Sequence, residues 1–261
     1  MEKRPYLTSF WFLALLTFIS GILAEGAHLF LVSSGFRDRL PPLLAVAIPG
    51  FLAGALFPYL VIRWVYRESL ASLGIRWWTA GRRSLTWLLV TCGATFIVWL
   101  VFWAGLMALL QLAPEGNEAA TTLSRNPLTM VLAGESSARL LAVLIYFAVL
   151  VGFAEELLGR GLLQNVLDRG YDKVYGKGRF TIRKSTLLAA LLFGLWHTEW
   201  LQTDPLAILG SLLTSATIVM VPSLLLCVVY ERTRGMLVVI VLHNFIDFSK
   251  FVAWDWMLRL F

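Results

Sequence analysis

Ionisable side chains occur in three apolar stretches of the sequence, at spacings that suit acid–base chemistry. They are Glu155, Glu156 and Arg160 in "GFAEELLGRG" (152–161), His197 in "FGLWHTEW" (193–200), and His243, Asn244 and Asp247 in "LHNFID" (242–247). Because a charged side chain at mid-bilayer costs about 3 kcal/mol or more, such groups are expected to face a protein interior or to pair. Two of the three histidines in the protein fall in these stretches. This distribution favours one shared site over an accidental scatter.

Carboxylate and imidazole groups that meet in an apolar cavity can activate water for hydrolysis. In this interpretation Glu155 is the base, strengthened by poor solvation, and His197 shares its proton. His243 then donates a hydrogen bond to the oxyanion that forms. The same three side chains also form a known zinc ligand set, and the sequence has no H-E-x-x-H motif to decide. We favour hydrolysis that requires no cofactor, and zinc held by Glu155, His197 and His243 is the alternative.

Helical spacing separates the roles of the two adjacent glutamates. Glu156 and Arg160 stand at i and i+4, so they can form an ion pair along one helix face. Glu155 is rotated about 100° from Glu156 around the helix axis, which leaves its carboxylate for a cavity. His243 and Asp247 repeat the i, i+4 spacing in the last apolar stretch.

The elements that hold these residues are predicted to be transmembrane helices. The 261 residues are 59% hydrophobic and 15% charged, with a mean hydropathy of +0.76, which is too apolar for an ordinary soluble domain. We predict an all-α fold: a polytopic bundle of about seven to eight transmembrane helices that forms one domain over residues 1–261. The two cysteines, Cys92 and Cys227, lie in separate apolar runs, so no disulfide is expected.

Seven apolar runs approach or exceed the roughly 20 residues that a bilayer-spanning helix needs. They lie at about 8–34, 42–66, 85–112, 138–168, 184–200, 206–230 and 235–258. Measured from the cytoplasmic ends, Glu155, His197 and Asp247 lie roughly 20 Å along their helices, at 1.5 Å per residue. His243 lies about one turn lower. Three helices can therefore present their polar groups at one level.

Basic residues between the runs indicate the orientation of the chain. Lys and Arg concentrate before the first run and in the second, fourth and sixth connections, whereas the third connection (113–137) is mainly acidic. Arg37 and Arg39 in the first connection are exceptions. The positive-inside rule then predicts a cytoplasmic N-terminus and a multi-pass protein of the cell membrane, plasma or inner. The net charge of +6 reflects this distribution, so membrane lipids are expected as partners and nucleic acid is not.

The first run carries two further ionisable residues, Glu25 and His28. A mutual pair or an interfacial location is expected for them. The apolar part of this run is longer than the roughly 7–15 residues of a signal-peptide core, so we expect a retained helix.

Three motifs resemble those of the CAAX protease and bacteriocin-processing family of intramembrane proteases, whose eukaryotic relative is the type II CAAX prenyl endopeptidase. "EELLGR" (155–160) resembles its E-E-x-x-x-R motif, "FGLWH" (193–197) its F-x-x-x-H motif, and "HNFID" (243–247) its H-x-x-x-N/D motif. The order and the helix placement agree. The resemblance covers about 136–250, which is the predicted protease-like core.

The resemblance implies a role for each motif residue. Glu155 activates water with His197, His243 and Asp247 support the oxyanion, and Glu156 and Arg160 brace the helix, with Asn244 as a further supporting residue. The implied substrate is a peptide or protein, lipidated or not, that is cut within or next to the membrane.

Two positions depart from the family pattern. Gly159 stands where the family often has an aromatic residue, and the missing side chain is expected to widen the pocket. Asp247 replaces the common asparagine, and an ionised aspartate cannot donate a hydrogen bond. Asp247 is therefore either protonated or a residue that orients His243.

These observations predict an intramembrane endopeptidase that acts in the cytoplasmic half of the bilayer. A non-catalytic scaffold or chaperone that binds a partner in the same cavity is the alternative. A proton-coupled transporter is a third hypothesis. It is disfavoured because the sequence has no recognisable pair of internal repeats, which many transporters have.

Overall fold

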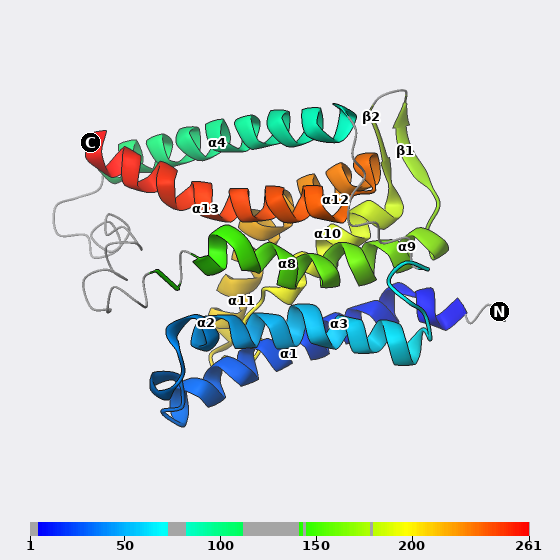
Figure 1. Ribbon diagram of the computed structural model, residues 1–261. Coiled ribbons are helices and arrows are strands. Elements are labelled where there is room, and N and C mark those ends of the chain that lie inside the picture. The colour runs from blue at the N-terminus through cyan, green and yellow to red at the C-terminus, as the bar shows by residue number, and fades with distance from the viewer. Residues whose placement is uncertain (1–4, 73–81, 112–140, 143–144, 178–179, 261) are drawn as a thin grey trace.

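The computed structural model describes residues 5–72, 82–111, 141–142, 145–177 and 180–260 (Figure 1). The acidic third connection, at 113–137, lies outside these residues. In chain order the elements are the 3-10 helix η1 (Pro5–Thr8), α1 (Phe10–Ser33), the 3-10 helix η2 (Arg37–Arg39), α2 (Pro42–Gly50), the π-helical η3 (Phe51–Leu56), α3 (Phe57–Leu60), the π-helical η4 (Val61–Val65), α4 (Arg82–Gln111), the π-helical η5 (Tyr146–Leu150), α8 (Val151–Glu156), the π-helical η6 (Leu157–Gln164), α9 (Asn165–Gly170), the strands β1 (Val174–Lys177) and β2 (Phe180–Arg183), α10 (Lys184–Trp196), α11 (Pro205–Thr214), the π-helical η7 (Ser215–Val219), α12 (Met220–Thr233) and α13 (Met236–Leu260).

Local sequence signals fix several helix ends. The Ser9 side chain accepts a hydrogen bond from the Phe12 amide and caps α1. Asp204 caps α11 by accepting from the Leu206 amide, with Pro205 in the first helical position. These side chains satisfy backbone N–H groups that have no partner inside the helix.

Three continuous rods, at 42–65, 145–170 and 205–233, contain π-helical turns. In two of them prolines lie close by, since Pro49 precedes η3 and Pro222 follows η7. Proline lacks an N–H, and membrane helices accommodate the freed carbonyl by local π adjustments. The eight-residue segment η6 contains no proline and begins directly after Glu156. π-Helical interruptions of α-helices are frequent at functional sites.

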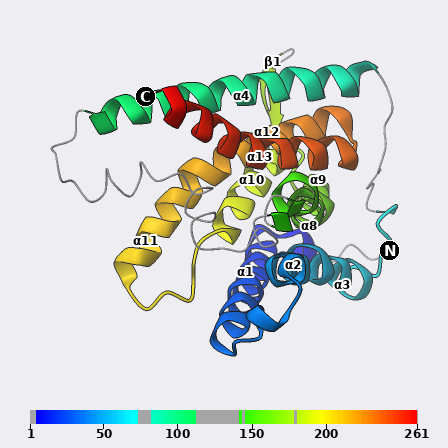
Figure 2. The ribbon, with the colours of Figure 1, turned by 60° about the vertical axis from the view of Figure 1, so that its left-hand side comes forward.

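The rod formed by η5, α8, η6 and α9 is the centre of the molecule. Figure 1 shows α13 along one side of it and α1 with the 42–65 rod along the other, and Figure 2 shows the same order nearly end-on. The helix α4 packs on the outer side of α13. Every residue from 154 to 167 is buried. A helix that is enclosed on all sides can hold charged groups away from lipid.

Three described helical segments are long and apolar enough to cross a membrane: Phe10–Ser33, Leu43–Val65 and Ser84–Phe102. Shorter apolar helices occupy Lys184–Trp196, Pro205–Thr214 and Met236–Ser249. A mainly helical bundle with candidate membrane-spanning segments is therefore confirmed. The count of seven to eight spans stays a prediction.

Two details of the observed fold differ from the sequence expectations. The fold is not purely helical, because β1 and β2 form an antiparallel hairpin with Val174 opposite Arg183 and Lys177 opposite Phe180. The run predicted at 184–200 is helical only to Trp196, and His197 is the residue that ends it. Polar residues after His197, including Thr198 and Glu199, carry the chain into a turn instead of a further helical turn.

Side-chain hydrogen bonds join three chain segments at one end of the bundle. The Tyr66 hydroxyl donates to the Leu7 carbonyl, and the Tyr171 hydroxyl accepts from the Phe10 amide. The start of the described chain and the second and fourth connections thus lie together, as the charge distribution predicts. That this end faces the cytoplasm stays a prediction.

A bidentate ion pair at this end should make the stability depend on pH. Arg169 donates from Nη1 to Glu68 Oε1 at 2.5 Å and from Nη2 to Glu68 Oε2 at 2.9 Å. The hydrogen bonds from Arg169 hold the pKa of Glu68 below its ordinary value. A lowered folded-state pKa gives stability that is present above the unfolded pKa of about 4.3 and is lost as the pH falls.

We therefore expect Glu68→Gln to lower the melting temperature by roughly 2–4 °C at neutral pH, which corresponds to about 1 kcal/mol. The difference between Glu68→Gln and wild type should shrink as the pH falls below about 4.3. Thermal unfolding of the detergent-solubilised protein from neutral to acidic pH measures both effects. A difference that stays constant over this range would show that the ion pair adds no pH-dependent stability.

Candidate active site

Two histidines from different helices converge on Glu155. The Nε2 atom of His197 lies 3.3 Å from Glu155 Oε2, and the Nε2 atom of His243 lies 3.6 Å from the same oxygen. Glu155 belongs to α8, His197 ends α10, and His243 lies in α13. The structure thus brings together the three residues that the sequence analysis assigned to one site.

The second ring nitrogen of His197 faces a backbone carbonyl. Its Nδ1 lies 2.9 Å from the Phe193 oxygen. Because a carbonyl only accepts, Nδ1 must carry the hydrogen, and in the neutral ring Nε2 is an unprotonated acceptor. Nε2 and Glu155 Oε2 are therefore two acceptors, 3.3 Å apart, that can share one added proton. Such a pair can take a proton from water and return it later.

The second ring nitrogen of His243 is held by Glu156. The Nδ1 atom of His243 lies 2.5 Å from Glu156 Oε1, and the same oxygen accepts from Arg160 Nη1 at 2.8 Å. Two donors on one carboxylate oxygen fix the His243 ring with Nε2 directed toward Glu155. Glu156 was expected only to brace its own helix. The structure shows that it also orients the ring of His243.

Arg160 is fully buried and has partners on three elements. Besides Glu156, it donates from Nη2 to the backbone oxygen of Ser223 at 2.8 Å and to Ser223 Oγ at 3.1 Å. Its guanidinium carbon also lies 4.9 Å from the centre of the Phe193 ring. The expected i, i+4 ion pair is thus present, and it additionally ties the central rod to α12 and α10.

Asp247 and Asn244 lie near His243 but have different surroundings. Asp247 Oδ2 is 3.4 Å from His243 Nε2, on the cavity side of the ring. Asn244 accepts from the Gly152 amide at 2.7 Å and donates to the Val149 oxygen at 2.9 Å. These are backbone groups at the junction of η5 and α8, where the hydrogen-bond pattern changes. Asn244 therefore joins α13 to the central rod next to Glu155.

The junction at Gly152 leaves no room for a side chain. A Cβ atom there would lie 2.7 Å from the Ile240 oxygen and 2.8 Å from Asn244 Oδ1. Both distances are too short for van der Waals contact. Glycine thus allows α13 to approach the rod closely enough to place His243 beside Glu155.

A cavity of about 300 Å³ opens on these groups. Glu155, His197, His243 and Asp247 line it, while Glu156 and Asn244 do not. The remaining lining is mostly apolar or aromatic: Trp99, Tyr146, Phe147, Val151, Phe193, Val219, Pro222, Ser223, Leu226 and Ile246. The site therefore combines a few convergent polar groups with an apolar wall, which is the usual composition of a ligand pocket.

The expectation that Gly159 widens this pocket is wrong. A Cβ atom at Gly159 would lie 3.0 Å from the Phe193 ring. Phe193 already fills the space, and it packs against both Arg160 and His197. The aromatic residue next to the arginine is thus supplied by α10.

Glu25 does not pair with His28 in the part of the chain that the structure describes, and the other alternative, an interfacial location, stays a prediction. Among the residues that the structure describes, Glu25 contacts the chain after His197, where its Oε2 accepts from the Leu201 amide at 2.9 Å. The sequence contained no signal for this contact, because the partner is a backbone group 176 positions away.

Within the described ranges, no group of three or more His, Cys, Asp or Glu residues has the arrangement of a metal site.

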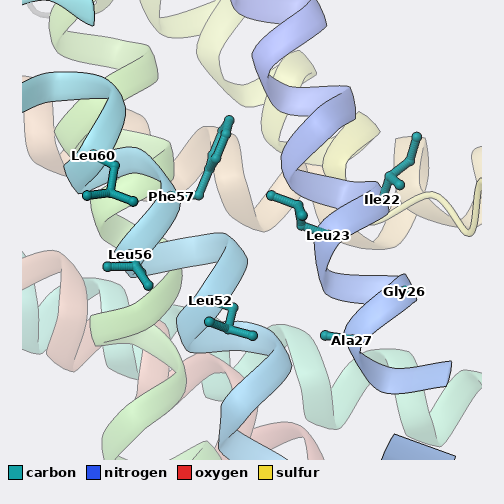
Figure 3. Close-up of a pocket in the computed structure, with 8 residues that line it drawn as sticks. All are labelled: Ile22, Leu23, Gly26, Ala27, Leu52, Leu56, Phe57 and Leu60. Atoms are coloured by element: carbon teal, nitrogen blue, oxygen red, sulfur yellow. The ribbon is translucent and has the colours of Figure 1, made fainter. Parts of the chain in front are cut away.

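A second cavity, of about 360 Å³, lies between α1 and the η3–α3 segment. Figure 3 shows its lining, which is Ile22, Leu23, Gly26, Ala27, Leu52, Leu56, Phe57 and Leu60. None of these side chains can take part in acid–base chemistry. The cavity at Glu155 is thus the better candidate for a reaction site.

A helical membrane protein with a buried glutamate between two histidines has the groups that a peptidase needs. The sequence model of the family described as type II CAAX prenyl endopeptidase Rce1-like matches residues 137–249. By this match, residues 137–249 resemble a family of membrane proteases, and the resemblance predicted from the three motifs is confirmed. No curated protein and no solved structure matches the chain. All the site residues discussed above, from Glu155 to Asp247, fall within the matched segment.

Proposed function

We propose that the protein is an intramembrane endopeptidase that hydrolyses a peptide bond of a membrane-associated protein or peptide, lipidated or not. The observation that carries this proposal is the convergence of two histidine Nε2 atoms on Glu155 Oε2. The match of residues 137–249 to the model of a protease family supports it. The predicted orientation places the reaction in the cytoplasmic half of the cell membrane.

Glu155 and His197 are proposed to activate water. A water molecule beside Glu155 transfers a proton to the pair, and the hydroxide attacks the carbonyl carbon of the peptide bond. Because the Phe193 oxygen fixes the hydrogen on His197 Nδ1, the Nε2 atom faces Glu155 and shares the proton. The pair then passes this proton to the leaving amine, which restores the starting state.

His243 is proposed to donate a hydrogen bond to the oxyanion of the tetrahedral intermediate. Nδ1 already donates to Glu156, so Nε2 can donate only in the imidazolium form. The two carboxylates near its ring, Glu156 and Asp247, balance that positive charge. The contacts of Nε2 with Glu155 and Asp247 are 3.6 and 3.4 Å. Both exceed a good hydrogen-bond length of about 3.0 Å, so a substrate oxygen can compete for this donor.

Asp247 is proposed to orient His243 as an ionised acceptor. This choice follows from its position opposite Nε2, where an imidazolium hydrogen needs an acceptor before substrate binds. Glu156 and Arg160 hold the other side of the ring, and Asn244 holds α13 against the central rod.

A comparison of membrane peptides tests the function. A strain that lacks the protein is complemented with wild type or with His197→Gln, and the peptides of both membranes are identified by mass spectrometry. We expect cleavage products that appear with wild type and are absent with His197→Gln. If complementation restores the strain phenotype equally with both proteins and no product differs, the protein acts as a scaffold and the peptidase proposal fails.

A further inference from the structure

We propose that α1, which lies outside the segment matched by the protease family, positions the candidate catalytic residue His197. The positioning residues are Ser20 and Glu25, which hold the chain immediately before and after His197. This inference rests on the proposed function only for its effect on turnover. The effect on the histidine ring itself does not depend on what the protein does.

His197 needs support because it lies where a helix ends. It is the C-terminal cap of α10, and its φ and ψ angles of −84° and 2° lie outside the α-helical region. Its side chain is about a quarter exposed to the cavity, at 27%. The residues from 198 to 204 form turns and bends. The ring orientation therefore depends on what holds the two flanking segments.

Ser20 holds the segment before His197. The indole Nε1 of Trp196 donates to Ser20 Oγ at 3.0 Å, and Ser20 Oγ donates to the Ala53 oxygen at 2.8 Å. One fully buried hydroxyl thus links α10, α1 and η3. The Trp196 ring in turn forms a wall of the histidine site, since it meets the His197 ring edge-on with centroids 4.8 Å apart.

Gly21, next to Ser20, lies where α1 approaches Trp196 closely. A Cβ atom at Gly21 would lie 3.3 Å from the Trp196 oxygen and 3.6 Å from Trp196 Cδ1. One turn earlier, Phe18 packs edge-on against Trp200 with ring centroids 5.4 Å apart. The helix α1 therefore contacts aromatic residues on both sides of His197.

Glu25 holds the segment after His197. Its Oε2 accepts a hydrogen bond from the Leu201 amide at 2.9 Å. The bond ties the backbone of the turn that follows His197 to α1. This contact gives a reason for an acidic residue in α1, which neither the cavity chemistry nor the expected pairing with His28 explains.

Variants of α1 test the proposal in the full-length protein in detergent. Ser20→Ala removes the acceptor for Trp196, and Glu25→Ala removes the acceptor for Leu201. Glu25→Gln keeps an acceptor oxygen in the same place. His28→Ala, on an exposed position of the same helix, is the matched control.

Two measurements are made on each variant. The first is the nitrogen NMR signals of the histidine rings in ¹⁵N-histidine-labelled protein, which report tautomer and hydrogen bonding. The second is kcat and KM for a substrate identified from the membrane peptides. We expect Ser20→Ala and Glu25→Ala to shift the His197 signals and to leave those of His243 in place. Turnover should fall on the order of tenfold with KM unchanged, because the base is misplaced and not removed.

Glu25→Gln and His28→Ala should keep wild-type signals and turnover. The proposal is overturned if His197 keeps its wild-type signals in both alanine variants, or if Glu25→Gln is as impaired as Glu25→Ala. A shift of His243 together with His197 overturns it too, since that indicates a general loss of structure. Should Ser20→Ala fail to fold, the two Glu25 variants alone test whether α1 positions His197. If the protein cleaves no peptide at all, the NMR signals still test this positioning. A failure of the peptidase proposal can therefore be told apart from a failure of the positioning proposal.

Discussion

Replacing Glu155 by glutamine is expected to lower kcat/KM by about 10³-fold or more, while the protein still inserts and folds. Glutamine has nearly the same shape as glutamate, but its amide cannot take a proton from water. The side chain lies in a cavity and forms no hydrogen bond shorter than its 3.3 Å contact with His197 among the described residues. The fold should therefore tolerate the change. Cleavage of a substrate in reconstituted liposomes measures the loss, and thermal unfolding measures the fold.

Asp172→Asn provides the matched control, because it removes a carboxylate from an exposed position after α9. It should leave kcat/KM unchanged. Retained turnover in Glu155→Gln at wild-type level would remove Glu155 from the mechanism. A chelator separates the two ways of activating water, since only the zinc alternative predicts loss of activity that added zinc restores. The proposed carboxylate mechanism predicts equal rates with and without the chelator.

Arg160→Met is expected to give the largest loss of stability, roughly 3–5 kcal/mol in the free energy of unfolding. The substitution removes hydrogen bonds to Glu156 and Ser223 and leaves the Glu156 carboxylate buried with one partner fewer. Unfolding in mixed detergent measures the change. Arg39→Met, at an exposed position, is the control and should have little effect.

The double variant Glu156→Leu, Arg160→Met distinguishes stability from function. Removing both charges should recover part of the stability, because a buried ion pair contributes little net energy once its desolvation is counted. Activity should not recover, since His243 Nδ1 then loses the acceptor that orients its ring. If the double variant were fully active, Glu156 would have no part in holding His243.

Several features of the molecule follow from local sequence. Apolar runs predict helices near their observed bounds, as in α1 (Phe10–Ser33) and the rod at 42–65, because burial in a membrane-like core requires backbone groups to pair within the segment. The i, i+4 spacing of Glu156 and Arg160 predicts their ion pair, since that spacing puts both side chains on one face. The three motifs predict the family that the comparison with the family model confirms.

Other features depend on contacts between distant residues, which no local pattern contains. The sequence does not reveal that α10 ends at Trp196, that Phe193 fills the space beside Gly159, or that Glu156 binds His243. The contact of Glu25 with the Leu201 amide joins two segments far apart in the chain. The nearness of His28 in the sequence therefore did not predict the partner of Glu25. Composition and periodicity determine which residues are helical and which polar side chains must be shielded from lipid. Which buried groups then meet is decided only when the helices pack, because each polar group takes the partner that the surrounding helices bring within hydrogen-bond distance.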